Sequence, residues 1–175
     1  REASSNLSVA EAYCTIQRGA ADVMLAGATG TRLHAMRRIH ITTQEQLGNG
    51  YADPTRVSRP FDLNRTGLVL GEGAGAVILE ERERAAARGA NIYGEVVGYG
   101  SSFVPPRDSS GNIAQALQQA IEMACRSSDM KPEEIGHIHA HGLSTHSSDR
   151  EEAQGIQAVF GENNSTPPVV AAKSH

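Results

Sequence analysis

Four of the chain's seven histidines lie within residues 137–149, in the stretch HIHAHGLSTHSSD. His137, His139 and His141 occupy alternate positions, so on a strand their side chains would point to one face. With His146 they resemble a zinc site, because imidazole is a common zinc ligand. Same-face neighbours on a strand are about 6.5–7 Å apart, whereas zinc–nitrogen bonds are about 2 Å long. The spacing favours one reactive histidine, and a metal-dependent hydrolase built on the cluster remains an alternative.

The residues that follow His141 single it out from the other histidines. Gly142 permits a tight turn, hydroxyl residues come next, and a predicted helix then carries Asp149 and Glu152 near its start. Carboxylates are favoured at this end of a helix by the helix dipole. Asp149 could therefore be only a helix cap, or it could orient the groups of an active site. Both interpretations stay open at this point.

A glycine-rich stretch, GEGAGA at residues 71–76, imitates a dinucleotide-binding loop. Such a loop needs a strand before it and a helix after it. Here the glycines run into VILEE, an apolar and partly β-branched segment that is typical of a strand. The pattern therefore favours close backbone packing at a bend of a sheet over a phosphate site.

The composition is that of an ordinary globular domain. The chain has 175 residues, of which 39% are hydrophobic and 21% are charged, with a net charge of −4. This balance gives no electrostatic footprint for nucleic acid or a membrane surface. The two cysteines lie far apart and predict no disulfide framework, so a cytoplasmic location is expected. Because the chain has no initiator methionine and stops in mid-pattern, we expect a fragment of a longer domain.

Strands and helices are predicted to alternate along the chain. The predicted helices cover residues 5–18, 43–47, 80–89, 112–128 and 147–161. The predicted strands cover residues 22–28, 91–102, 137–142 and part of 167–174, with a strand, a glycine-rich bend and a second strand over 67–81. This order predicts an α/β protein with a largely parallel sheet, in which chemistry gathers at the carboxyl ends of strands. His141 would lie at such an end.

Several motifs together resemble the β-ketoacyl-acyl carrier protein synthases, the condensing enzymes of fatty acid and polyketide synthesis. They are RGAADVMLAGAT (residues 18–29), the segment from DPTRVSRPFD to VVGYG (53–100), AHGLSTHSSDREEAQGIQAVFG (140–161) and KS (173–174). The resemblance implies a partial thiolase-like fold of layered α/β/α type. Residues 1–105 would hold the C-terminal part of its first half with connecting strands, and residues 106–175 the start of its second half. Residues 101–111 are the candidate linker.

The resemblance also implies a transferase that acts on thioesters of acyl carrier protein. In that mechanism a cysteine takes the acyl chain, malonyl-carrier protein loses CO₂, and the resulting carbanion attacks. His141 matches the first catalytic histidine, Lys173 the supporting lysine, Asp149 and Glu152 the supporting carboxylates, and Thr145 a hydroxyl that contacts pantetheine. No cofactor of its own is implied, since phosphopantetheine arrives on the carrier protein. The expected partners are acyl carrier protein and a second synthase subunit, in a homodimer or a heterodimer.

The chain departs from the family pattern at three places. Glu2 stands at the position of the nucleophilic cysteine, Leu143 replaces the first threonine of the HGTxT motif, and RTGLV (residues 65–69) stands where R-D-G-F-V is usual. The second catalytic histidine would fall beyond residue 175, since His175 comes too early. The alignment could slip at Glu2, Glu2 could have an acid–base role of its own, or the protein could be a non-condensing member. The last is favoured, because losing a nucleophile abolishes covalent catalysis but not binding or electrostatics. The expected activity is then decarboxylation, with a non-catalytic chain-length-factor-like partner subunit as the alternative.

Overall fold

The computed structural model describes residues 3–50, 53–103, 112–161 and 166–174. The chain forms two compact units, each made from two separate stretches of sequence. The first unit comprises Arg1–His34 and Gly71–Val97, and the second comprises Ala35–Leu70 and Gly98–His175. The expected boundary between residues 105 and 106, and most of the candidate linker, lie outside the described residues. None of the described helices is long and apolar enough to cross a membrane.

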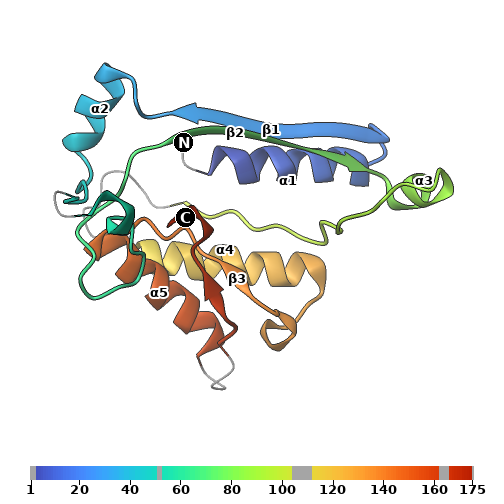
Figure 1. Cartoon of the computed structure of the whole chain (residues 1–175). Helices are drawn as coiled ribbons and strands as arrows, with labels where there is room; N and C mark the ends of the chain where they lie inside the picture. Colours follow the sequence, from blue (N-terminus) through green and yellow to red (C-terminus); the bar gives the residue numbers. More distant parts are fainter. Residues whose placement is uncertain (1–2, 51–52, 104–111, 162–165, 175) are drawn as a thin grey trace. The chain divides into compact units, whose positions relative to one another are not determined.

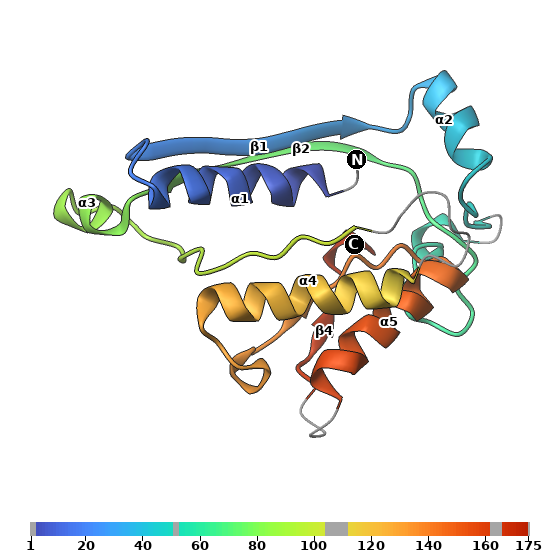
Figure 2. The same ribbon diagram turned by 180° about the vertical axis from the view of Figure 1, so that it is seen from behind.

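The first unit is a helix packed on a two-stranded ribbon (Figures 1 and 2). Helix α1 (Ser4–Gln17) runs along one side of strands β1 (Val23–Thr31) and β2 (Glu72–Glu80), and the short helix α3 (Arg82–Ala87) follows. Alanines form the buried contact surface, since Ala10 and Ala12 of α1 and Ala26 of β1 are all buried. Small side chains let the helix approach the ribbon closely. The helix predicted over residues 5–18 is confirmed, and Gly19 follows it in a left-handed conformation with φ +70°.

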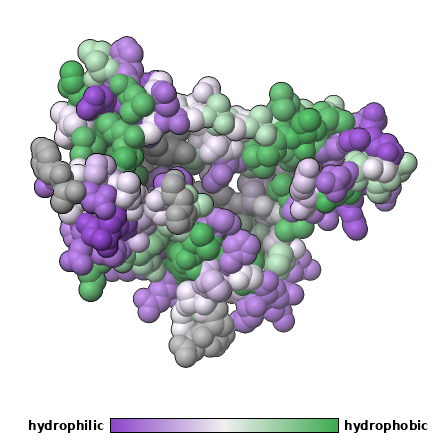
Figure 3. Space-filling model, viewed as in Figure 1, coloured by the Kyte–Doolittle hydropathy of each residue, from purple (hydrophilic) through white to green (hydrophobic). Residues whose placement is uncertain are grey.

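The opposite side of the ribbon presents large apolar side chains to solvent. Leu25 and Ile78 lie directly opposite each other in the register, and they are 73% and 71% exposed. Because strand side chains alternate, they point away from the face that buries Ala26 against α1. Figure 3 shows apolar surface gathered over part of this ribbon.

Three predictions for this unit are wrong. The ribbon is antiparallel, with Val23 opposite Glu80, although a largely parallel sheet was expected. The predicted bend over residues 67–81 is also absent, because Glu72–Glu80 is one continuous strand that contains Gly73 and Gly75 of GEGAGA. No helix follows these glycines directly, so the phosphate-loop interpretation fails. The close packing expected of the GEGAGA glycines is not found either, since a Cβ on Gly71, Gly73 or Gly75 would meet nothing within 4 Å. The close approach in this ribbon is required by Gly27 of β1, where an added Cβ would lie 2.6 Å from the carbonyl oxygen of Gly75.

The second unit contains helices α2 (Ala35–Thr42), α4 (Ile113–Ser128) and α5 (His146–Phe160), with the short strands β3 (Ile138–His139) and β4 (Val169–Val170). Helices α4 and α5 lie side by side in both views (Figures 1 and 2). A Cβ on Gly155 of α5 would lie 2.8 Å from the carbonyl oxygen of Ala114, so only glycine allows this approach. The predicted helices over 112–128 and 147–161 are confirmed. Strands β3 and β4 pair in parallel, as expected for the sheet.

The structure corrects two further elements of this unit. The helix expected at residues 43–47 lies at Ala35–Thr42, where Ile41 is buried. The hydroxyls of Thr42 and Thr43 donate to the carbonyls of Ile39 and His40, which satisfies acceptors at the helix end. The strand predicted over residues 91–102 is not formed as a ladder in the described structure.

Residues 98–100 instead lie alongside helix α4. The backbone N–H of Tyr99 donates to Ser127 Oγ at 2.8 Å, and Ser127 Oγ donates to the Tyr99 carbonyl at 3.0 Å. A Cβ on Gly100 would collide with the carbonyl oxygen of Ala120. The glycines therefore serve a close helix contact, and a side chain takes the backbone hydrogen bonds that a neighbouring strand would otherwise make.

Candidate active site

The carboxyl ends of β3 and β4 bring His141 and Lys173 together. The two strands are parallel, and the N–H of Ala140 extends their pairing by donating to the Val170 carbonyl at 2.8 Å. His141 follows β3 by two residues, and Lys173 follows β4 by three. Lys173 Nζ lies 2.6 Å from His141 Nδ1. Two residues that are distant in sequence thus meet because both strands end at the same edge.

In this contact the donor and acceptor roles depend on the tautomer of the imidazole. A charged lysine ammonium has three donors and no acceptor, so beside it Nδ1 of His141 accepts a hydrogen bond. A neutral imidazole that accepts at Nδ1 carries its own proton on Nε2. Opposite a charged Lys173, His141 is thus a neutral hydrogen-bond donor through Nε2. Such a donor can stabilise negative charge that develops on a substrate oxygen.

Glu152 holds the backbone of His141. Its carboxylate accepts the N–H groups of His141 at 2.6 Å and of Gly142 at 2.9 Å. Gly142 has φ +54°, and an added Cβ would lie 2.9 Å from Ala171 Cβ and 3.1 Å from Pro60 Cβ. Both the conformation and the space require glycine. The predicted tight turn is confirmed.

Asp149 clamps the next part of the same turn, and its side chain is 1% exposed. It accepts the N–H of Ser144 at 2.9 Å and the N–H of Phe61 at 2.8 Å, and Arg65 Nε lies 3.4 Å from it. The cap of α5 is instead Thr145, whose hydroxyl accepts the N–H of Ser148 at 3.3 Å. Of the two interpretations left open above, the structure supports a carboxylate in a network.

Thr145 is buried, with 2% of its surface exposed. Its hydroxyl is engaged in capping α5 in this structure. The pantetheine contact that the resemblance implies for this residue stays a prediction.

The remaining histidines of the cluster do not join His141. The rings of His137 and His139 contact each other edge to face, with centroids 4.9 Å apart. His146 is the first residue of α5. Within the described residues, no group of three or more His, Cys, Asp or Glu side chains could hold a metal ion. The metal-dependent alternative gains no support from this arrangement.

Glu2 and His175 lie outside the described residues. The assignment of Glu2 to the nucleophile position, and the expectation that a second histidine follows residue 175, therefore rest on the sequence.

Sequence reasoning missed the segment 59–65, which contacts the turn after His141. The N–H of Arg59 donates to Ser144 Oγ at 2.9 Å, and the Arg65 side chain donates to the carbonyls of Thr145 and His146, each at 3.0 Å. Arginines in a loop are normally exposed, so their residue type carried no signal of burial. The available signal was the RPFDLNRTG motif, which formed part of the resemblance without an assigned role.

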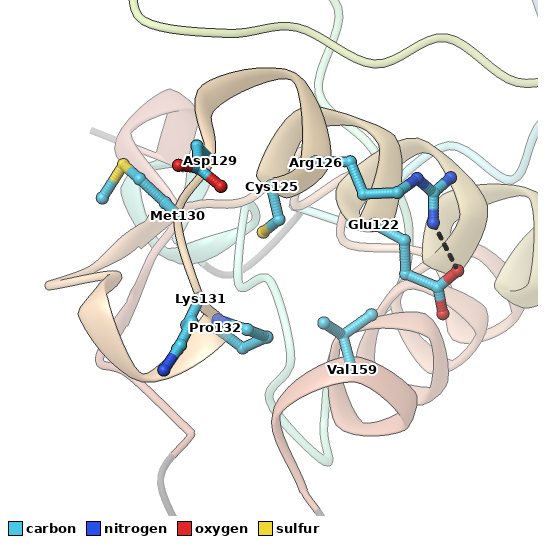
Figure 4. A pocket seen from close by; sticks show the side chains of 8 residues that line it. All are labelled: Glu122, Cys125, Arg126, Asp129, Met130, Lys131, Pro132 and Val159. Carbon is cyan, nitrogen blue, oxygen red and sulfur yellow. Dashed lines mark ion pairs between the residues drawn. The ribbon is translucent and has the colours of Figure 1, made fainter.

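A separate pocket of about 420 Å³ lies where α4 ends and α5 passes beside it (Figure 4). Its lining includes Cys125, Lys131 and Val159, and it does not include His141 or Lys173. Burial, and then the nearby carboxylate of Glu122, raise the pKa of the Cys125 thiol above its usual range. A raised pKa lowers the thiolate fraction, so Cys125 is a poor nucleophile.

Comparison with known proteins identifies the family of the chain. Its α/β fold is the thiolase-like fold of solved ketosynthases. Residues 1–85 match the family model "Beta-ketoacyl synthase, N-terminal domain", and residues 93–175 match "Beta-ketoacyl synthase, C-terminal domain". The chain belongs to the β-ketoacyl synthase family.

Individual relatives give the same result. The mitochondrial 3-oxoacyl-[acyl-carrier-protein] synthase of Arabidopsis thaliana is 39% identical over 163 residues, which cover 89% of this chain. A type II polyketide ketosynthase solved with its acyl-carrier protein, AntDE:AntF, has a TM-score of 0.89 at 32% identity over 98% of this chain. The ishigamide ketosynthase/chain length factor has a TM-score of 0.81 at 32% identity, again over 98% of this chain. The chain spans only 34%, 43% and 40% of the length of these three relatives.

Proposed function

We propose that this chain is part of a ketosynthase-like transferase of fatty acid or polyketide synthesis that acts on thioesters of acyl carrier protein. In it, His141 and Lys173 carry the decarboxylation of malonyl-carrier protein. The observation that supports this most is the 2.6 Å contact between Lys173 Nζ and His141 Nδ1. The ammonium holds the imidazole in the form that donates from Nε2.

The chemistry follows from that form. As the bond to the malonyl carboxylate breaks, its electron pair moves into an enolate, and negative charge develops on the thioester oxygen. A hydrogen bond from His141 Nε2 to this oxygen stabilises the transition state more than the ground state, which lowers the barrier. Glu152 keeps the histidine backbone fixed through the N–H groups of His141 and Gly142. CO₂ leaves, and the enolate carbon takes a proton from solvent water to give the acetyl thioester.

Condensation needs a nucleophile that accepts an acyl group. A glutamate at position 2 cannot form an acyl thioester, so decarboxylation without condensation is the activity that we propose. Acyl carrier protein is the proposed partner, in a protein that forms a homodimer or a heterodimer with a related synthase subunit. No cofactor beyond the phosphopantetheine of the carrier protein is required.

The second candidate is a non-catalytic partner subunit that resembles a chain-length factor. Glu2 and Leu143, which replace a nucleophile and a hydroxyl of the family pattern, favour it. The likeness to the ishigamide ketosynthase/chain length factor is compatible with both candidates.

The two candidates differ in CO₂ release. Full-length protein is incubated with malonyl-acyl carrier protein labelled at the free carboxyl carbon, and labelled CO₂ is counted. We expect CO₂ release by the wild type, loss of release in His141→Ala and retention in His139→Ala. No β-ketoacyl product should form when carrier protein loaded with an acyl chain is added. Release that stays at the level of the protein-free control would refute decarboxylation. The partner candidate would then be tested by co-purification with a related synthase.

A further inference from the structure

Arg65 occupies an electrostatically unusual place at the start of α5. Its side chain is 12% exposed and lies beside the first residues of that helix. A cation is unfavourable there, because the helix dipole makes this end positive. The arginine is nonetheless held by the Asp149 carboxylate and by three backbone carbonyls, those of Thr145, His146 and Asp62. Several fixed contacts for one cation at a disfavoured position indicate a site built around its shape.

The planar fork of the guanidinium matches these acceptors. Nε donates to the Thr145 carbonyl at 3.0 Å, Nη2 to the His146 carbonyl at 3.0 Å, and Nη1 to the Asp62 carbonyl at 2.8 Å. The donors of arginine leave the side chain in fixed directions, whereas those of lysine radiate from one atom. Arg65 therefore fixes the first turn of α5 relative to its own loop in a way that a point charge cannot reproduce.

The same loop makes two further hydrogen bonds, one to the turn that follows His141 and one to helix α5. The N–H of Arg59 donates to Ser144 Oγ, and the N–H of Phe61 donates to Asp149. Ser144 has φ +66° and Phe61 has φ +65°, backbone conformations that residues other than glycine rarely adopt. Such conformations persist where several contacts with the surrounding structure hold the backbone in place.

We infer that Arg65 is a positioning residue for His141. It locks the first turn of α5, and Asp149 and Glu152 on that helix then hold the backbone from Ser144 back to His141. The contact of the imidazole with Lys173 depends on this placement. The inference rests on the proposed function for its kinetic consequences, and on geometry alone for its effect on the His141 ring.

The kinetic test compares Arg65→Met and Arg65→Lys in the full-length protein with labelled malonyl-carrier protein. Misplacing a reacting group by about 1 Å can cost about 100-fold in rate, so we expect Arg65→Met to lower kcat at least about tenfold. KM should change less than about twofold, because a positioning residue acts through His141 and the backbone that holds it. Arg65→Lys should recover part of kcat, since it keeps the charge but not the fork.

Two matched controls separate positioning from stability. Arg150→Met removes an exposed arginine from the same helix and should leave kcat within about twofold. Phe160→Leu weakens the buried far end of α5 and should lower Tm without a comparable loss of kcat. If Arg65→Met lowers Tm as Phe160→Leu does and leaves kcat unchanged, Arg65 is only structural and the inference is wrong.

A readout that needs no turnover keeps this inference distinct from the proposed function. The imidazole ¹⁵N resonances of His141 are recorded in protein labelled at histidine and assigned with His141→Ala. We expect Arg65→Met to shift or broaden them, Arg65→Lys to shift them less, and Arg150→Met to leave them in place. Unchanged resonances in Arg65→Met would overturn the inference even if the enzyme releases CO₂. A shift in a protein without decarboxylase activity would support the positioning role and refute only the proposed function.

Discussion

Replacing Asp149 by asparagine should destabilise the second unit by a large and measurable amount. The carboxylate is 1% exposed and accepts two backbone N–H groups, from Ser144 at 2.9 Å and from Phe61 at 2.8 Å. An asparagine of the same shape offers one oxygen and one NH₂ group. One of the two backbone N–H groups must then face the NH₂ group of asparagine, which is also a donor. Arg65 also loses the negative charge that partly balances its own.

The magnitude follows from these contacts. A hydrogen bond to a charged group contributes about 1.5–3 kcal/mol, and leaving a buried N–H without an acceptor costs about 1–3 kcal/mol. The ion pair adds little, because Arg65 Nε is 3.4 Å away and the guanidinium keeps three carbonyl acceptors. The total is about 3 kcal/mol. With a urea m-value of about 2 kcal/mol per molar, the midpoint should fall by about 1.5 M.

The assay is urea unfolding followed by circular dichroism at pH 7, with Asp22→Asn as the matched control. Asp22 is 71% exposed and pairs with Arg84 at 2.7 Å on the surface. Exposed ion pairs are worth about 0–1 kcal/mol, so this control should move the midpoint by less than about 0.5 M. If Asp149→Asn moves the midpoint no further than Asp22→Asn does, the carboxylate does not clamp the turn as described.

Three further substitutions test other parts of the structure. Lys173→Met should lower CO₂ release about 100-fold, because the proton of the His141 ring can then lie on either nitrogen, and Lys173→Arg should recover part of the activity. Equal activity in wild type and Lys173→Met would contradict the assigned role. Because burial and Glu122 raise the pKa of the Cys125 thiol, iodoacetamide should alkylate Cys125 slowly at pH 8 and faster in Glu122→Gln; mass spectrometry follows the rate, and an unchanged rate would argue against the charge effect. A hydrogen bond from Arg88 lowers the pKa of Glu80. The charged carboxylate therefore stabilises the fold at neutral pH, and this contribution is lost as the pH falls through the folded-state pKa. Glu80→Gln should therefore lower the urea midpoint at pH 7, with a difference from wild type that narrows in acid; a constant difference would refute the pKa argument.

The elements with clear local signals were predictable. The amphipathic spacing of residues 112–128 and the carboxylates at the start of 147–161 located α4 and α5 within one or two residues. His141 could be singled out because glycine and a helix start follow it. Lys173 became a site residue only through the family resemblance, since nothing local to KS predicts a partner 32 residues upstream.

The elements that failed depend on contacts between distant segments. The glycines of residues 71–76 suggested a bend, yet Gly73 and Gly75 lie in one continuous strand. The position that needs glycine for a close approach is Gly27 on the neighbouring strand. Residues 91–102 have a strand composition, but a ladder needs a neighbour, and Tyr99 bonds Ser127 instead. The role of Arg65 could not be read from the sequence, because its partners lie 80 and 81 residues away.

The central claim is that Lys173 fixes His141 as a neutral imidazole that donates from Nε2. The most direct measurement is a ¹⁵N–¹H correlation spectrum of the histidine side chains in full-length protein at pH 7, with His141 assigned from His141→Ala. The structure predicts a protonated Nε2 and an unprotonated Nδ1, and loss of this pattern in Lys173→Met. A proton on Nδ1, or a spectrum that Lys173→Met leaves unchanged, would contradict the claim.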